Sequence, residues 1–274
     1  MSPPCLVGIV NITEDSFSDG GRYLDPSDAI AHARALLAAG AQVIDLGAAA
    51  SNVDAQPVSA ADEIRRLEPV IAGLAAENTP ISVDSFLPEV QRFAVARGAA
   101  FLNDIQGFPD PSFYPELAAA SCRLVVMHAV QGRGRAERVE LAADQVWDRI
   151  YDFFGERLAS LERAGVARER LILDPGMGFF LSNRPEASLR VITGLGRLKR
   201  DFALPVLVSV SRKSFLRAIT GRTSALETGA ATLAAEIYAA EIGADYIRTH
   251  DPGALGDALK IMAALRSEAT QFSC

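Results

Sequence analysis

The sequence has few of the features that several common protein classes require. It contains three cysteines and three histidines in 274 residues, and neither set has the spacing of a metal-binding motif. No apolar run approaches the roughly 20 residues of a transmembrane helix, and Cys5 begins an apolar run too early to leave room for a signal peptide. A P-loop, a dinucleotide-binding glycine motif and a nucleophilic serine elbow are also missing. We therefore expect no membrane association, reduced thiols and a cytoplasmic location.

Positive charge is also in short supply. The chain has 27 Lys and Arg against 34 Asp and Glu, which gives a net charge of −7. This balance argues against nonspecific nucleic-acid binding, so we expect no nucleic-acid partner. Any anionic substrate has to be held by cations gathered locally, because the overall field repels it.

Eight short apolar runs alternate with helical stretches, and nearly every run ends on a polar residue. This alternation is typical of a parallel α/β fold, and with this length it predicts a single (β/α)8 TIM barrel over residues 1–274. The carboxyl ends of all eight strands would then surround one site. The residues that end the runs are, in chain order, Asn11, Asp45, Asp84, Asn103-Asp104, His128, Asp174, Ser211 and Arg248-Thr249-His250.

Turn and capping residues mark the helices between the runs. Gly-Ala pairs begin at 40, 98 and 243, where glycine suits the left-handed position after a helix. Asp25-Pro26 and Ser59 have the pattern of helix N-caps. Apolar spacing predicts a helix over 142–164, with Trp147 as a packing or interface residue. The alanine-rich helix over 228–242 suits either a dimer interface or packing on the barrel.

Three of the run-ending residues are hydrogen-bond acceptors: Asp84, Asn103 and Asp174. Buried carboxylates are costly unless they are paired or hydrogen-bonded. Converging on one cavity, the three suit a flat heterocycle with several N–H donors, such as an aminopyrimidinone. The alternative is that each accepts from amides of its own loop. After Asp174, the glycines of Pro175-Gly176-Met177-Gly178 allow close backbone approach to a ligand. Phe179 and Phe180 follow, and either wall the pocket or belong to the core.

Cationic residues end the last two runs. In Ser211-Arg212-Lys213-Ser214 we expect one of the two cations to point inward and the other outward. Arg248 and His250 fall on the same face of the last strand, which suits an anionic leaving group. The alternative is a surface arginine beside a capping histidine.

A polar loop with glycines at its end follows the first run, over residues 11–21. Long loops after barrel strands are usually functional lids. Asn11 either offers a neutral oxygen to a hard cation or caps the loop.

Together these segments resemble the dihydropteroate synthases, from about Val7 to His250. The most specific parts are the 11–21 loop, Asp174-Pro175-Gly176-Met177-Gly178-Phe179, Ser211-Arg212-Lys213-Ser214 and Arg248-Thr249-His250. The resemblance implies a TIM barrel that condenses 6-hydroxymethyl-7,8-dihydropterin diphosphate with p-aminobenzoate to give 7,8-dihydropteroate and diphosphate. It also implies Mg2+ as the cofactor and a homodimer.

The resemblance implies roles for individual residues. The pterin-binding residues would be Asp84, Asn103, Met127, Asp174 and Lys213. The diphosphate would meet Asn11, Arg248 and His250, with Asn11 also at the metal. The p-aminobenzoate side would include Phe17, Ser51, Phe179, Lys213 and Ser214, with Asp19 in the mobile first loop. Candidate catalytic residues are Lys213, Arg248, His250 and Asp84. The carboxylates favour the cation that develops on the pterin, and the cations neutralise the departing diphosphate.

Two segments depart from the common family pattern. After the second strand the family has a Thr-Arg pair, whereas this chain has Ser51-Asn52, which keeps the hydroxyl and loses the guanidinium. After the fourth strand stands a bulky aromatic, Phe108. Both features resemble the sulfonamide-insensitive branch of the family. We hypothesise that Phe108 enters the p-aminobenzoate subsite and excludes sulfonamides, the alternative being that it packs under its loop.

Two other functions fit parts of the pattern. A pterin-dependent methyltransferase would share the barrel and the acidic pocket, but it has no use for an Arg/His diphosphate site. A non-catalytic pterin-binding barrel would be expected to lose Lys213, Asn11 or Arg248, and all three are present.

Overall fold

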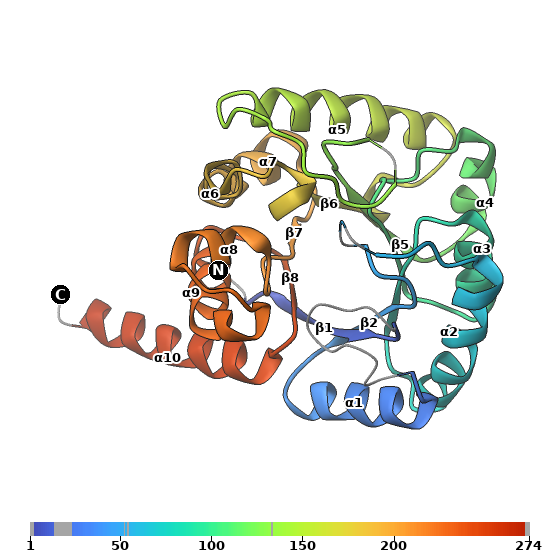
Figure 1. Cartoon of the computed structure of the whole chain (residues 1–274), viewed down its shortest axis with the longest axis horizontal. Helices are drawn as coiled ribbons and strands as arrows, with labels where there is room; N and C mark the ends of the chain where they lie inside the picture. The colour runs from blue at the N-terminus through green and yellow to red at the C-terminus, as the bar shows by residue number, and fades with distance from the viewer. Residues whose placement is uncertain (1–2, 14–23, 52, 54, 133, 272–274) are drawn as a thin grey trace.

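Eight parallel strands surround the centre of the molecule. The computed structural model describes residues 3–13, 24–51, 53, 55–132 and 134–271. Within these residues the strands form one sheet in the order β6-β5-β4-β3-β2-β1-β8-β7. A bridge between Leu173 and Val206 joins its two edges, so the sheet closes into a barrel (Figure 1). The strands are β1 Cys5–Asn11, β2 Val43–Gly47, β3 Ile81–Asp84, β4 Phe101–Asp104, β5 Arg123–Met127, β6 Leu171–Asp174, β7 Leu207–Val208 and β8 Tyr246–Thr249.

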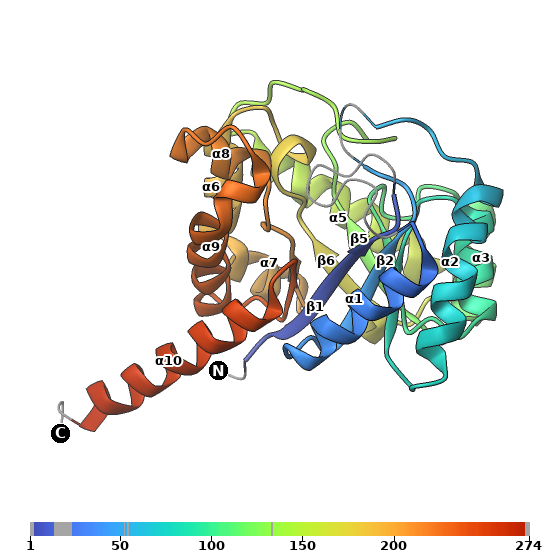
Figure 2. The same cartoon turned by 60° about the horizontal axis from the view of Figure 1, so that its bottom comes forward.

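Helices pack around the outside of the barrel, as Figures 1 and 2 show. The α-helices are α1 Pro26–Ala38, α2 Ala60–Ala75, α3 Pro88–Ala96, α4 Tyr114–Ala119, α5 Val146–Arg163, α6 Pro185–Thr193, α7 Leu195–Phe202, α8 Ser214–Thr220, α9 Gly229–Glu241 and α10 Pro252–Gln271. Short 3-10 helices lie at η1 Pro111–Phe113, η2 Arg168–Arg170, η3 Gly178–Phe180 and η4 Ala225–Thr228. The predicted (β/α)8 TIM barrel is confirmed.

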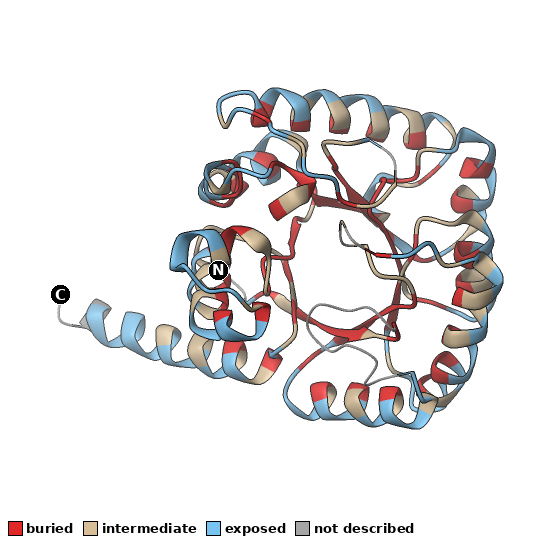
Figure 3. Ribbon diagram, viewed as in Figure 1, coloured by how far each residue is buried: buried red, intermediate tan, exposed pale blue. Residues whose placement is uncertain are grey.

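Side-chain alternation along the strands sorts residues between two environments. Residues of one parity, such as Leu46, Val83 and Leu124, are fully buried in the large core that includes the helices. Those of the other parity face the barrel interior, where an apolar layer of Val7, Val43, Val125, Ile172, Leu207 and Tyr246 forms the floor. Figure 3 shows the strands buried along most of their length. The inward residues nearer the carboxyl ends are polar, and this change positions the site above the floor.

The predicted helix signals are present. The Asp25 side chain accepts from the Ser27 amide at 2.7 Å, and Ser59 accepts from the Asp62 amide at 3.1 Å. Gly40, Gly98 and Gly243 have φ of 104°, 78° and 97°, the left-handed region that favours glycine.

Three boundaries differ from the prediction. Strand β2 continues past Asp45 to Gly47, so Asp45 lies within the strand and faces the barrel interior. Strand β7 keeps only Leu207 and Val208 of the predicted run, and α5 begins at Val146 rather than at 142. Trp147 is buried, with the Arg197 guanidinium 5.1 Å from the ring centroid, which confirms its packing role.

Helix α10 extends away from the barrel at its carboxyl end (Figure 2). Ile261 and Leu265 on this helix are 61% and 60% exposed. In the part of the chain that the structure describes, no helix combines the length and the apolar character needed to cross a membrane.

Candidate active site

Three adjoining cavities lie at the carboxyl ends of the strands. We name them the inner, cationic and outer cavities, with volumes of about 20, 150 and 340 Å3. Lys213 and Ser51 line all three. The run-ending residues that line these cavities are far apart in the sequence, and the fold brings them together around the Lys213 side chain.

The inner cavity gathers the predicted acceptors. Asp84, Asn103 and Asp174 line it together with Met127. The Asn103 Oδ1 atom is buried and finds no hydrogen-bond partner among the described residues. Burial raises the pKa of Asp84 to about 7 and that of Asp174 to about 6. A ligand that brings N–H donors would satisfy these acceptors and stabilise the ionised carboxylates.

Arg248 is held by two carboxylates inside the barrel. Its Nε donates to Asp45 Oδ2 at 2.6 Å, and its Nη2 donates to Asp84 Oδ2 at 3.0 Å. The side chains of Arg248 and Asp45 are 13% and 1% exposed. Attraction between such buried charges offsets the large penalty of removing them from water. Arg248 thus connects the inner and cationic cavities, both of which it lines.

Asp45 was missing from the predicted site residues. Strand β2 places it beneath Arg248, between the buried Ile44 and Leu46. A carboxylate inside an otherwise apolar run is the signal that could have identified it, since an unpaired charge there would be costly. Asp45 was among the run-ending residues but received no role, because its partner Arg248 is 203 residues away in the sequence.

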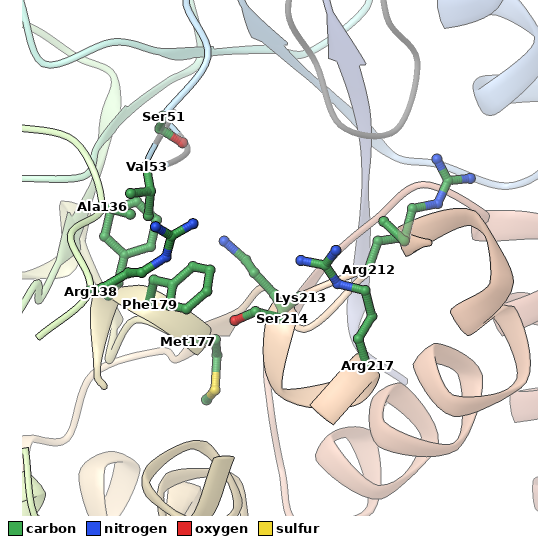
Figure 4. A pocket seen from close by; sticks show the side chains of 12 residues that line it. Ser51, Val53, Ala136, Arg138, Met177, Phe179, Arg212, Lys213, Ser214 and Arg217 are labelled. Carbon is green, nitrogen blue, oxygen red and sulfur yellow. The ribbon is translucent and has the colours of Figure 1, made fainter. Parts of the chain in front are cut away.

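Lys213 precedes α8, and its side chain is half-buried. The Nζ atom lies 5.0 Å from the centroid of the Phe180 ring. Burial, followed by the Arg248 charge, lowers the pKa of Lys213 to about 8. In Figure 4 the Lys213 side chain points into the outer cavity and the Arg212 side chain points away from it. Arg212 nevertheless lines the outer and cationic cavities together with Lys213, so the expectation that one of the two cations points away from the site is not supported.

The cationic cavity combines hydroxyl, amide and cationic groups. Asn11, Thr13, Ser211, Arg212, Arg248 and His250 are among its lining residues. The His250 Nδ1 atom lies 2.8 Å from Ser211 Oγ, and the His250 amide donates to the same oxygen at 3.3 Å. Burial and then the Arg212 charge hold the pKa of His250 well below its ordinary range. His250 is therefore a neutral hydrogen-bonding group here, and Arg248, Arg212 and Lys213 supply the positive charge.

The outer cavity has an aromatic wall and a cationic rim (Figure 4). Phe179 forms part of the wall, with the Arg138 guanidinium 6.0 Å from its ring centroid. Ser214 and Arg217 come from the first turns of α8. A Cβ on Gly178, which has φ of 64°, would lie 3.0 Å from Ser214 Oγ, so glycine allows η3 to approach α8. An aromatic carboxylate fits these surroundings.

Arg138 and Arg217 are site residues that the strand-end pattern missed. Arg138 lies in the long connection after β5, and Arg217 lies within a helix, so neither ends an apolar run. Only the folded arrangement brings them to the cavity.

Phe108 is not in the predicted subsite. It is 2% exposed, packs in the main core and lines none of the three cavities. Its amide donates to Asp104 Oδ2 at 3.1 Å, and its carbonyl accepts from the Tyr114 hydroxyl at 2.8 Å. Gly107 and Phe108 both have φ of 61°, in the left-handed region of backbone conformation. The hypothesis that Phe108 enters the p-aminobenzoate subsite is therefore wrong for this structure, and the alternative of packing under the loop is the arrangement found.

Two of the predicted site residues, Phe17 and Asp19, and the departing residue Asn52 lie outside the described residues. The other predicted positions, apart from Phe108, line at least one of the three cavities.

The chain matches the family described as pterin binding enzymes over residues 7–250. It is 58% identical over 264 residues to the dihydropteroate synthase type-2 of Escherichia coli, covering 96% of this chain and 97% of that protein. The chain belongs to the dihydropteroate synthase family. It is also 35% identical over 270 residues to the dihydropteroate synthase of Escherichia coli strain K12, covering 97% and 93% of the two chains.

Solved structures of this family have the same fold. The Xanthomonas albilineans dihydropteroate synthase with 4-aminobenzoic acid superposes with a TM-score of 0.86 at 37% identity, covering 96% of this chain and 93% of that one. The Yersinia pestis enzyme in a sulfonamide drug complex gives a TM-score of 0.88 at 31% identity, covering 97% and 95%. The resemblance found in the sequence is confirmed at the level of family and fold.

Proposed function

We propose that the enzyme condenses 6-hydroxymethyl-7,8-dihydropterin diphosphate with p-aminobenzoate to give 7,8-dihydropteroate and diphosphate. The observation that carries this proposal is the position of Lys213, whose ammonium borders an acceptor-rich cavity, a cationic cavity and an aromatic-walled cavity. Three parts of a substrate pair, the pterin ring, the diphosphate and the aryl amine, correspond to the three cavities. Relatives have been solved with 4-aminobenzoic acid and with 7,8-dihydropteroate, which supports the same assignment.

The chemistry requires positioning and charge stabilisation rather than a protein nucleophile. The C–O bond between the pterin methylene and diphosphate breaks, an N–C bond forms to the aryl amine, and the amine proton leaves with diphosphate or solvent. Asp84, Asn103 and Asp174 accept the ring N–H groups and favour the cation that develops on the pterin. Arg248 and Lys213 stabilise the negative charge that builds on the departing diphosphate.

We propose that Mg2+ binds at the cationic cavity with the diphosphate. The described residues contain no cluster of three His, Cys, Asp or Glu side chains suited to a metal. Asn11 at the end of β1 supplies a neutral oxygen at the edge of this cavity. That set fits an ion that takes most of its ligands from substrate phosphates and water. When bound, the ion would neutralise phosphate charge, and Asn11 would hold it from the protein side.

We place p-aminobenzoate in the outer cavity, and we propose that this cavity makes the enzyme insensitive to sulfonamides. The carboxylate would face Lys213, Ser214 and the arginines of the rim. A sulfonamide replaces this planar carboxylate with a bulkier tetrahedral group. Phe179, held between Arg138 and the cavity, narrows the space that such a group would need. We therefore propose that the wall formed by Phe179, and not Phe108, is the barrier to sulfonamides.

The test is a turnover assay with the pterin diphosphate and p-aminobenzoate, with and without Mg2+, under a sulfonamide titration. We expect Mg2+-dependent release of dihydropteroate that a sulfonamide inhibits poorly. Phe179→Ala should lower the inhibitory sulfonamide concentration by roughly tenfold or more, the effect of relieving a clash of about 1.4 kcal/mol. Phe108→Ala, the matched control, should lose stability by about 3–5 kcal/mol as a core truncation without gaining sensitivity.

Each part of this proposal can fail separately. Absence of dihydropteroate formation by the folded enzyme would contradict the reaction. Strong inhibition of the unmodified enzyme would contradict insensitivity. Sensitivity gained by Phe108→Ala and not by Phe179→Ala would contradict the assignment to the outer cavity.

We also propose that the enzyme is a cytoplasmic homodimer that associates through α9 and α10. Tyr238 on α9 is 43% exposed, and Ile261 and Leu265 on α10 are more exposed still. Large apolar side chains gathered on neighbouring helices are typical of an interface. The free thiols of Cys5 and Cys122 suit a reducing compartment. Analytical ultracentrifugation should show a dimer that Ile261→Asp with Leu265→Asp converts to monomers, and a monomeric unmodified protein would contradict the proposal.

A further inference from the structure

The inward face of α9 is polar, although helices that cover a barrel usually bury apolar residues there. Thr232, Glu236 and Ala239 are the buried residues of this alanine-rich helix. Thr232 and Glu236 are four residues apart, so both lie on the same face. They are 7% and 2% exposed. A buried carboxyl and a buried hydroxyl on a packing face require a reason beyond stability.

Both side chains contact the loops that form the cationic cavity. The Thr232 hydroxyl accepts from the Arg212 amide at 3.2 Å, just after β7. The Glu236 carboxyl lies near the Thr249 hydroxyl at the end of β8 and near the Arg212 guanidinium, and both groups act to lower its pKa. Thr249 is fully buried. One face of α9 therefore holds the ends of two neighbouring strands.

The backbone at Arg212 requires such support. Arg212 has φ of 59°, a left-handed conformation that costs a non-glycine residue about 1–2 kcal/mol. It lies between Ser211, which is hydrogen-bonded to His250 at 2.8 Å, and Lys213, which enters all three cavities. A change in this turn would move each of these groups. The Thr232 hydroxyl holds this turn through the Arg212 amide, and Glu236 lies beside Thr232 on the same face of α9.

Glu236 itself has no access to a substrate. It lines none of the three cavities, and its Oε1 atom finds no hydrogen-bond partner among the described residues. Burial raises its pKa to about 8, Asp251 acts in the same direction, and Thr249 and Arg212 oppose this rise. A carboxyl kept at this penalty beside two substrate-facing loops has a role that those loops can transmit to the site.

We propose that Glu236 is a positioning residue, which through Thr249 and Arg212 holds the loops after β7 and β8 in the arrangement that binds diphosphate. The inference rests on the proposed function, which places diphosphate in the cationic cavity. It adds that the outer helix α9, and not only the strand ends, determines the affinity of that cavity. Substitution of Glu236 would then weaken the diphosphate end of the site selectively, and the p-aminobenzoate end would change little.

The test combines diphosphate binding with steady-state kinetics on the full-length protein. Inorganic diphosphate with Mg2+ is titrated by calorimetry, and the KM of each substrate is measured. Glu236→Ala should raise the diphosphate Kd and the KM for the pterin diphosphate roughly tenfold, as losses of supporting residues do at other sites, and leave the KM for p-aminobenzoate within about twofold. Glu236→Gln, which keeps an acceptor for Thr249, should stay within about threefold of the unmodified enzyme.

Glu241→Ala is the matched control on the same helix. Glu241 pairs with Arg266 on α10 at the surface, and we expect unchanged diphosphate affinity in this variant. Equal diphosphate binding by Glu236→Ala and the unmodified enzyme, or equal increases of both KM values, would overturn the inference. If Glu236→Ala does not fold, Thr249→Val removes the partner hydroxyl with little change in shape, and unchanged diphosphate affinity in that variant would overturn it as well.

The failure of this inference differs from failure of the proposed function. An unmodified enzyme that binds no diphosphate with Mg2+ would contradict the assignment of the cationic cavity itself. An unmodified enzyme that binds diphosphate, beside a Glu236→Ala variant that binds it equally well, would contradict only the role of Glu236.

Discussion

Replacing Arg248 with methionine is expected to lower the free energy of unfolding by about 3–5 kcal/mol, the effect of removing one partner from a buried ion pair. Asp45 is 1% exposed and Asp84 is 17% exposed, so both carboxylates would lose their cation in a site that water scarcely reaches. Urea denaturation followed by circular dichroism at neutral pH measures this change. Activity should also be lost, since Arg248 lines the inner and cationic cavities.

The loss should depend on pH in a defined direction. Burial already raises the pKa of Asp84 to about 7, with Arg248 opposing that rise, so the variant should have a still higher pKa there. The pKa of such a carboxyl is near 4 in the unfolded state and higher in the folded state. The protein therefore loses folding stability as the pH rises from the unfolded-state value to the folded-state value. Arg248→Met should therefore be closest to the unmodified enzyme in acid and furthest from it above neutral pH.

A second substitution identifies the cause. Adding Asp45→Asn to Arg248→Met removes one of the uncompensated charges and should recover part of the lost stability. The surface pair of Arg92 with Glu116 offers the control, because both side chains are about half exposed, and Arg92→Met should leave unfolding nearly unchanged. An Arg248→Met variant as stable as the Arg92→Met variant would mean that the barrel does not need this cation.

Asp174→Asn should reduce kcat/KM for the pterin diphosphate by roughly 100- to 1000-fold. The amide replaces one of two carboxylate oxygens by a donor, which would oppose the N–H groups of the ring. Asp174 Oδ1 already accepts from the Gly176 amide at 2.8 Å, so an asparagine that keeps this bond directs its NH2 group at the ligand. Initial rates at varied pterin diphosphate, with p-aminobenzoate saturating, give the value.

Asp104 is the matched control for Asp174. It is equally buried, burial raises its pKa to about 6 as well, and it lines none of the three cavities. It accepts instead from the Gln106 and Phe108 amides and from Gln91. Asp104→Asn should lose stability and keep the KM for the pterin diphosphate. A similar kinetic loss in both variants would show that burial, and not ligand contact, explains the effect.

The pH profile gives a separate readout. The acceptor form of Asp174 and Asp84 is the ionised one, so kcat/KM should fall as pH falls through about 7 and 6. Two such groups give a steep acid limb. In Asp174→Asn only Asp84 remains to titrate. The slope of the acid limb, in a plot of log kcat/KM against pH, should therefore fall from two protons towards one.

The sequence predicted the inner end of the site well because it follows directly from strand periodicity. Asp84 and Asp174 end short apolar runs, so alternation fixed the face on which they lie, and closure of the sheet brought them together. Lys213 was found because it follows β7 in a run of polar residues. Asp45 also ended an apolar run, but it received no role because its partner Arg248 is 203 residues away in the sequence and only the fold brings the two together.

The outer end of the site depends on loop conformation, which local pattern does not encode. The direction of Phe108 is determined by amide bonds to Asp104 and by a hydroxyl bond from Tyr114, a contact that exists only after the helices have packed. Arg138 reaches the outer cavity from a long connection that shows no periodic pattern in the sequence. The sequence therefore identified an unusual segment at Phe108, but the predicted direction of this side chain was wrong.

The apolar floor of the barrel makes the pocket blind-ended. Val7, Val43, Val125, Ile172, Leu207 and Tyr246 form an apolar layer below Arg248, and the cavity that most of them border there is only about 10 Å3, so a ligand enters and leaves at the carboxyl ends of the strands. With the pterin in the inner cavity and p-aminobenzoate in the outer cavity, as proposed, we expect the pterin diphosphate to bind first and the product to leave past the rim before the next cycle. This geometry favours an ordered kinetic mechanism, which product-inhibition patterns would reveal.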